Sequence, residues 1–187
     1  MKNILKATFC LIMILTLSFP LISCGGMEDS EAKAIVKELV EKSTVVNEVL
    51  YGKGMDYEKS LDGKYQTMYS RVTDDAPFKT RKALEKEIKS IFTASYANSL
   101  LNHAFTLTVG IYGNSSYPRY QEGSDQVLTV MRDYEAREIT VYNFDTIVIE
   151  KATKNKIVAT IMSTENEKVY VYLINELDGW RLDSATV

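Results

Sequence analysis

The hydrophobic pattern of this chain of 187 residues changes its period once, near Phe105, and this change limits the fold more than any other feature. Between Ser30 and Phe105, apolar residues recur at steps of three, four and seven, which is the spacing of amphipathic helices. Beyond Phe105, they alternate or run together in short segments rich in β-branched and aromatic residues, which is typical of strands. Helices followed by a run of strands predict an α+β protein.

Two to three helices are expected before the change of period, depending on whether a bent pair is counted as one helix or two. The first has Ser30 as its N-cap and Gly52 just after its C-terminus, because serine favours N-caps and glycine favours the position that follows a helix. Pro77 and Thr80 open the second helix, and Thr93 caps a third, so that these two form a bent pair. The apolar positions that define the helices are Ile35, Leu39, Val46, Val49, Leu50, Leu84, Ile88, Ile91, Phe92, Tyr96, Leu100, Leu101 and Phe105.

Strands are expected in the second half of the chain. Turn sequences separate the last four, at spacings of 11 to 13 residues, which suit antiparallel hairpins and are too short for helical crossovers. We therefore expect two to three helices packed on a curved antiparallel sheet of four to six strands. The expected strands are Val127–Met131, Phe144–Glu150, Ile157–Met162, Lys168–Ile174 and Trp180–Asp183.

The end of the chain carries a family resemblance. The segment Tyr172-Leu-Ile-Asn-Glu-Leu-Asp-Gly-Trp-Arg-Leu-Asp183, together with the order of the elements, resembles the NTF2-like/cystatin-like superfamily. Many members of that superfamily end in a similar Asp-Gly-Trp strand, in which the tryptophan closes the sheet. The resemblance is also compatible with a homodimer, because isolated domains of this kind often dimerise through their sheets. It does not fix a function, since the superfamily holds many.

The start of the chain has the pattern of an export signal. Two lysines in Met1–Lys6 precede an uncharged run, Ala7–Ile22, and no acidic residue occurs before Glu28. The run is short for a membrane span, which needs about 20 residues, although a transmembrane anchor is the alternative. The next residues, Leu21-Ile22-Ser23-Cys24, resemble the bacterial lipobox, although a plain signal peptide with a chance cysteine is a further alternative.

The lipobox resemblance implies three segments and a location. Residues 1–23 are a lipoprotein signal peptide, residues 24–29 are a lipidated tether, and residues 30–187 are a single domain. In that family the cysteine, here Cys24, receives a diacylglyceryl group and becomes the new N-terminus. The expected location is therefore the extracytoplasmic face of the cell membrane, with membrane lipid as a partner through Cys24.

The numbers of cysteines, histidines and charged residues limit the chemical functions that the mature chain can have. Cys10 would leave with the signal and Cys24 would carry lipid, so no thiol chemistry is expected. A single histidine, His103, excludes a histidine-rich metal site, and we predict no metal, no cofactor and no catalytic residue. Loss of Lys2 and Lys6 changes the formal net charge from −3 to −5, which makes nucleic acid an improbable partner.

Two segments are candidates for binding. Gly110–Gln126 is the longest stretch without periodicity, and its residues Tyr112, Tyr117, Arg119 and Tyr120 form an aromatic set suited to stacking on a sugar or a peptide. A mobile connection between helix and sheet is the alternative for this segment.

The second candidate is the turn that holds Glu165 and Glu167. These two residues are suited to presenting negative charge to a basic groove of a partner protein, and an ordinary polar hairpin is the alternative.

A second, shorter resemblance points to a particular partner. Tyr69–Asp75, Thr80–Leu84 and Ile91–Ala97 resemble the middle region of the IseA-like family, which are secreted inhibitors of peptidoglycan D,L-endopeptidases. The resemblance covers about 30 residues and contains no inhibitory motif.

Three functions follow in order of expectation. The first is a lipid-anchored, non-catalytic binding module of the cell envelope, and the second is an inhibitor of cell-wall hydrolases. The third is a small NTF2-like enzyme, whose polar groups would come from His103, Tyr142, Asp145 and Tyr172.

Overall fold

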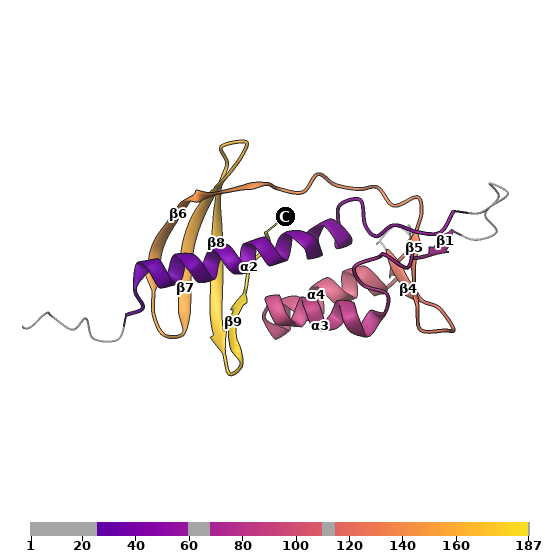
Figure 1. Ribbon diagram of the computed structural model, residues 1–187, viewed down its shortest axis with the longest axis horizontal. Helices are drawn as coiled ribbons and strands as arrows, with labels where there is room; N and C mark the ends of the chain where they lie inside the picture. The colour runs from indigo at the N-terminus through magenta and orange to yellow at the C-terminus, as the bar shows by residue number, and fades with distance from the viewer. Residues whose placement is uncertain (1–25, 60–67, 110–114, 187) are drawn as a thin grey trace, which may run out of the picture.

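A computed structural model describes residues 26–59, 68–109 and 115–186 of the chain (Figure 1). The predicted α+β class is confirmed: apart from the short strand β1 between the first two helices, the helices precede the strands, and the largest sheet comes last. The signal segment, Cys24 and Tyr112 lie outside the described residues, so the predictions made for them stay predictions. The elements are α2 (Asp29–Leu50), β1 (Tyr69–Arg71), α3 (Arg81–Ile91), α4 (Ala94–Phe105), β2 (Thr108–Val109), β3 (Ser115–Ser116), β4 (Tyr120–Glu122), β5 (Leu128–Met131), β6 (Tyr142–Ala152), β7 (Lys156–Ser163), β8 (Lys168–Glu176) and β9 (Gly179–Leu182).

The first helix, α2, begins slightly earlier than predicted. Its N-cap is Glu28, which has extended backbone angles, and Ser30 already lies inside the helix, so the predicted cap is wrong. Acidic residues in the first turn are favourable there because the N-terminus of a helix carries partial positive charge. The helix ends at Leu50, and the N–H groups of Tyr51 and Gly52 both donate to Asn47 O, at 2.8 and 3.2 Å. None of the helices in the described residues is long and apolar enough to cross a membrane.

Two threonines start the other helices, as predicted. The Thr80 hydroxyl accepts from Ala83 N at 3.2 Å at the start of α3, and the Thr93 hydroxyl accepts from Tyr96 N at 3.4 Å at the start of α4. Such caps satisfy a backbone donor that the helix itself leaves unpaired. Between the helices, Phe92 has an extended backbone and Thr93 also has non-helical backbone angles, and together they produce the predicted bend.

The strands form separate sheets at opposite ends of α2 (Figure 1). The last four strands make one antiparallel sheet in the order β6-β7-β8-β9. The predicted strand Val127–Met131 is found as β5, but it lies between β1 and β4 in a three-stranded sheet, where Leu128 and Val130 are buried. A third pair, β2 with β3, is also antiparallel.

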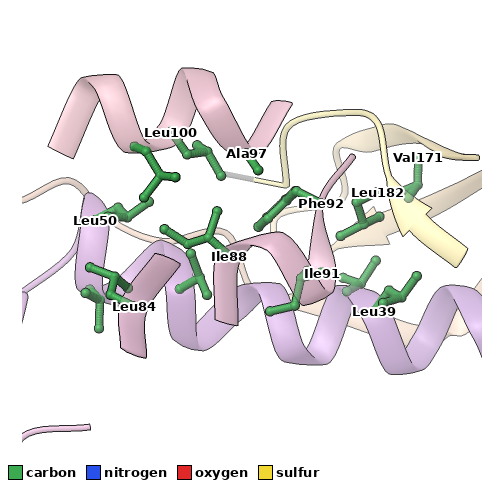
Figure 2. Close-up of a cluster of buried hydrophobic side chains, with 14 of the residues drawn as sticks. Leu39, Leu50, Leu84, Ile88, Ile91, Phe92, Ala97, Leu100, Val171 and Leu182 are labelled. Atoms are coloured by element: carbon green, nitrogen blue, oxygen red, sulfur yellow. The ribbon is translucent and has the colours of Figure 1, made fainter. Parts of the chain in front are cut away.

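The core joins the helices to the last strands (Figure 2). Phe92 forms a parallel bridge with Leu182 of β9, and Thr93 N donates to Leu182 O at 2.9 Å. The Thr93 hydroxyl also donates to a carboxylate oxygen of Asp183 at 2.7 Å, which reinforces the same junction. The side chains labelled in Figure 2 are Leu39, Leu50, Leu84, Ile88, Ile91, Phe92, Ala97, Leu100, Val171 and Leu182.

A long connection without regular secondary structure runs from β5 back to β6, and we call residues 132–141 the strap. In Figure 1 it passes above α2, from the three-stranded sheet to the four-stranded one. Its middle is held by Arg137 N, which donates to Tyr51 O at 2.7 Å, and its end by Thr164 N, which donates to Val141 O at 2.8 Å. The strap therefore lies against the C-terminal end of α2 and crosses to the β7–β8 hairpin.

Candidate functional site

Three hollows of the surface adjoin the strap and share its residues. The first has a volume of about 650 Å³, the second about 510 Å³ and the third about 140 Å³. Arg137 lines the first two, and Glu138 and Thr140 line the last two, so the hollows follow one another along the strap. The two larger volumes are in the range of ligand sites in proteins.

Five aromatic side chains line the two larger hollows. They come from segments far apart in the sequence. These residues are close in space because the end of α2, the helix α4 and the strap meet at this place. The residues are Tyr51, Tyr96, His103, Tyr117 and Tyr134. Aromatic rings that remain at the surface offer large, rigid contact areas to a peptide or a sugar ring.

His103 contacts two other members of this aromatic set. Its ring centroid is 4.9 Å from that of Tyr51, and its Nε2 is 3.5 Å from the hydroxyl oxygen of Tyr134. Burial lowers the pKa of His103 below its usual value, and the positive charges of Arg137 and Arg119 lower it further. The imidazole is therefore neutral at pH 7 and contributes a ring face and a hydrogen bond, not a positive charge.

Arg119 is buried beneath the first hollow and connects the end of α2 to Tyr134. It is only 2% exposed, and its Nε and Nη2 donate to Val49 O at 2.9 Å and Gly52 O at 2.8 Å. Its guanidinium carbon lies 3.8 Å from the ring centroid of Tyr134, so the cation stacks under a residue of the first hollow. A positive charge at this place is favourable because the C-terminus of a helix carries partial negative charge.

The structure divides the aromatic set that the sequence suggested. Tyr117 is 50% exposed and lines the first hollow, whereas Arg119 and Tyr120 are buried beneath the surface. The Tyr120 hydroxyl donates to Val49 O at 2.8 Å, so both buried residues bind the end of α2 and offer no surface for stacking. The segment is also less irregular than expected, since it contains β4.

Gly54 explains why Arg119 can reach the helix end. Its φ is +85°, a conformation that side chains rarely adopt, and a Cβ atom at this position would collide with Arg119 Nη2. The turn after α2 therefore needs glycine both for its backbone angle and for the approach of the guanidinium.

Glu165 and Glu167 lie in the predicted β7–β8 turn and line the third hollow. Their backbone N–H groups donate to the Ser163 hydroxyl at 3.2 and 3.1 Å, and Asn166 between them has a φ of +65°. Both acidic side chains are exposed, so the turn is fixed by its backbone while its carboxylates face the solvent.

The residues named for an enzyme are not brought together with His103. Tyr142 is buried, while Asp145 and Tyr172 are exposed on β6 and β8, with β7 between these strands. Among the described residues, no three side chains of the His, Cys, Asp or Glu type are grouped to hold a metal. No model of a protein family matches the sequence, and no curated protein matches it.

Proposed function

We propose that this chain is a lipid-anchored protein of the cell envelope whose NTF2-like domain binds a partner without catalysing a reaction. The anchor rests on the lipobox at Leu21–Cys24, and the NTF2-like assignment rests on the order of elements and on the strand around Trp180. The observation that carries the binding function is the aromatic lining of the two larger hollows along the strap. Four tyrosines and a neutral histidine stay at an open surface there, where they are available to a ligand.

Photocrosslinking in intact cells tests this function. A photoreactive phenylalanine analogue replaces Tyr117 in the full chain, and a matched variant carries it in place of Tyr170 on the open face of the β6–β9 sheet. Both tyrosines are 50% exposed, so the two probes are equally accessible and differ in the surface that they report. We expect adducts with an envelope component from position 117 and only background from position 170.

Two results of this experiment would contradict the proposal. Adducts from position 170 alone would mean that the open face of the sheet binds the partner and that the strap does not. An absence of adducts from both positions, in cells where the protein is present and lipidated, would mean that neither surface is occupied.

An inhibitor of peptidoglycan D,L-endopeptidases is the second candidate. The observation that favours it is the pair of exposed carboxylates at Glu165 and Glu167, which make no ion pair among the described residues. Such a pair can meet a basic groove of a partner enzyme. Under this candidate, the adduct formed from position 117 contains a cell-wall hydrolase, and a probe at Glu167 captures the same enzyme.

A further inference from the structure

The two ends of the large sheet carry charge of opposite sign. The β6–β7 and β8–β9 turns lie at one end, and the β7–β8 turn and the end of the strap lie at the other (Figure 1). Residues 151–156 and 176–181, which form the first end, include four basic and two acidic residues. The strap and residues 164–167, at the second end, include two basic and five acidic residues. We call residues 151–156 and 176–181 the basic end, because their charge is opposite in sign to that of the mature chain.

The lysines of the basic end face the solvent, whereas its acidic residues interact with other groups of the protein. Asp178 pairs with Arg181 at 2.8 Å. The half-buried Glu176 accepts a hydrogen bond from Ala94 N at 3.4 Å. The exposed basic residues are Lys151, Lys154 and Lys156. The surface that this end offers to a partner is therefore positive.

A large apolar side chain projects from the same surface. Leu177 lies in the two-residue turn between β8 and β9, and its side chain is fully exposed. Asn175 joins this hairpin to the β6–β7 turn, because its backbone N donates to Asn155 O and its Nδ2 donates to Lys154 O, both at 2.9 Å. The leucine and the lysines therefore belong to one connected surface. Such a combination suits a membrane boundary, where phosphates bind amines and the acyl region takes up an apolar side chain.

The proposed lipid anchor lies close to this surface. Asp29, the first residue of α2, is five positions after Cys24, so the chain between them spans at most about 18 Å. The helix packs on β6 and starts at the β6 side of the sheet, which is also the side of the β6–β7 turn (Figure 1). The first turn of α2 is itself acidic, so attraction to an anionic surface near the anchor depends on the lysines of the basic end.

We propose, building on the lipid anchor of the proposed function, that the basic end docks the domain on the headgroups of anionic phospholipids. The lysines bind the phosphates, and Leu177 enters the boundary of the acyl region. The acyl chains on Cys24 hold the protein at the membrane, and the docked turns set its orientation. The strap and its hollows then face away from the bilayer, where a partner in the envelope can reach them.

Quenching of a fluorescent dye by lipids tests this orientation in the full lipidated chain, reconstituted in vesicles. The mature chain is expected to have no free thiol, so one introduced cysteine places the dye at one position. Asn155→Cys reports the β6–β7 turn and Glu165→Cys reports the β7–β8 turn, and both positions are exposed. In vesicles with about one third phosphatidylglycerol and a quencher attached to lipid headgroups, we expect quenching about threefold or more stronger at position 155 than at position 165.

Charge reversal separates docking from anchoring alone. In the variant Lys151→Glu/Lys154→Glu, we expect the quenching at position 155 to fall to the level found at position 165, while the chain still floats with the vesicles. The control Lys53→Glu/Lys82→Glu makes the same charge change at exposed positions outside the basic end, and we expect less than about a twofold change.

Two further measurements separate the contributions of charge and of the leucine. Vesicles of phosphatidylcholine alone carry no net charge, and we expect them to abolish the excess quenching at position 155. Leu177→Ser keeps every charge and removes the apolar side chain, and we expect the excess quenching to fall about twofold or more.

The inference and the anchor fail in different ways. Equal quenching at positions 155 and 165 in a chain that floats with the vesicles would overturn the inference and leave the anchor and the binding function standing. Equal effects of the two pairs of lysine substitutions, or the same excess quenching in uncharged vesicles, would also overturn it. A chain that carries no palmitate and does not float would contradict the anchor, and the inference with it.

Discussion

Replacing Cys24 with alanine is expected to move the protein from the membrane fraction to the soluble fraction. The proposal attaches acyl chains to this cysteine, and each buried methylene group contributes about 0.8 kcal/mol to membrane binding. Two or three chains give stable anchoring, whereas the mature chain expected from Cys24 onward has a formal charge of −5, which anionic lipids repel. Fractionation of cells and labelling with radioactive palmitate measure the effect.

Cys10 offers a matched control for this experiment. It is the other cysteine of the chain and lies in the apolar run of the signal, where no lipid is attached under the proposal. Cys10→Ala is expected to keep both the label and the membrane location. A Cys24→Ala protein that stays in the membrane with its label intact would show that the lipobox assignment is wrong.

Arg119→Ala is expected to destabilise the fold by about 3 to 5 kcal/mol. The substitution removes a side chain that is only 2% exposed and leaves a cavity beneath Tyr134. It also removes the donor to Gly52 O, while Val49 O keeps its bond from the Tyr120 hydroxyl. Urea unfolding followed by circular dichroism measures the change in the free energy of unfolding.

Two further substitutions separate the effect of the cavity from the effect of the lost hydrogen bonds. Arg119→Met fills much of the cavity but leaves Gly52 O without its donor, and we expect a cost of about 1 to 3 kcal/mol. Part of that cost is offset because the variant no longer buries a cation whose Nη1 makes no hydrogen bond in the described part of the chain. Arg137→Met, at an exposed position of the strap, is expected to change stability by less than about 0.5 kcal/mol. Equal stability of Arg119→Ala and the wild type would contradict the support that Arg119 gives to α2.

The sequence predicted the helix starts and the hairpins that depend on interactions between residues close together in the chain. Thr80 and Thr93 start helices because a hydroxyl that accepts from a nearby N–H stabilises a helix start in almost any context. The four last strands were visible because alternation and short turns specify hairpins between neighbours in the sequence. The start of α2 was misplaced by two residues at its cap, since Glu28 takes the extended position without a capping hydrogen bond from its side chain.

Long-range pairing was not predictable in the same way. The strand at residues 127–131 has the composition of any other strand, and nothing local shows that β5 pairs with β1 and β4. Arg119 and Tyr120 looked like surface residues because a polar, non-periodic segment is typical of a loop. Their burial depends on the end of α2, about 70 residues earlier in the chain.

The candidate site was predictable only in part. Tyr117 and the pair Glu165 and Glu167 were selected from the sequence, and the structure places them at the first and third hollows. The strap that links these hollows carries no periodic pattern and no motif, so its role became visible only in three dimensions. Tyr51 and His103 belong to the site because α2 ends beside α4, which sequence spacing does not reveal.

The central claim is that the strap is the surface at which this domain binds a partner, and hydrogen exchange measures this most directly. Amide exchange is followed by mass spectrometry in the full lipidated chain, in isolated cell envelopes and after purification into micelles. Within residues 133–140, Arg137 N is the one backbone donor with a partner in the described structure, so these amides exchange quickly when the strap is free. If a partner covers the strap, we expect these amides to exchange more slowly in the envelope than in the purified protein. Unchanged exchange in the strap, with slowing confined to amides of β7 and β8, would show that the partner binds elsewhere and would contradict binding at the strap.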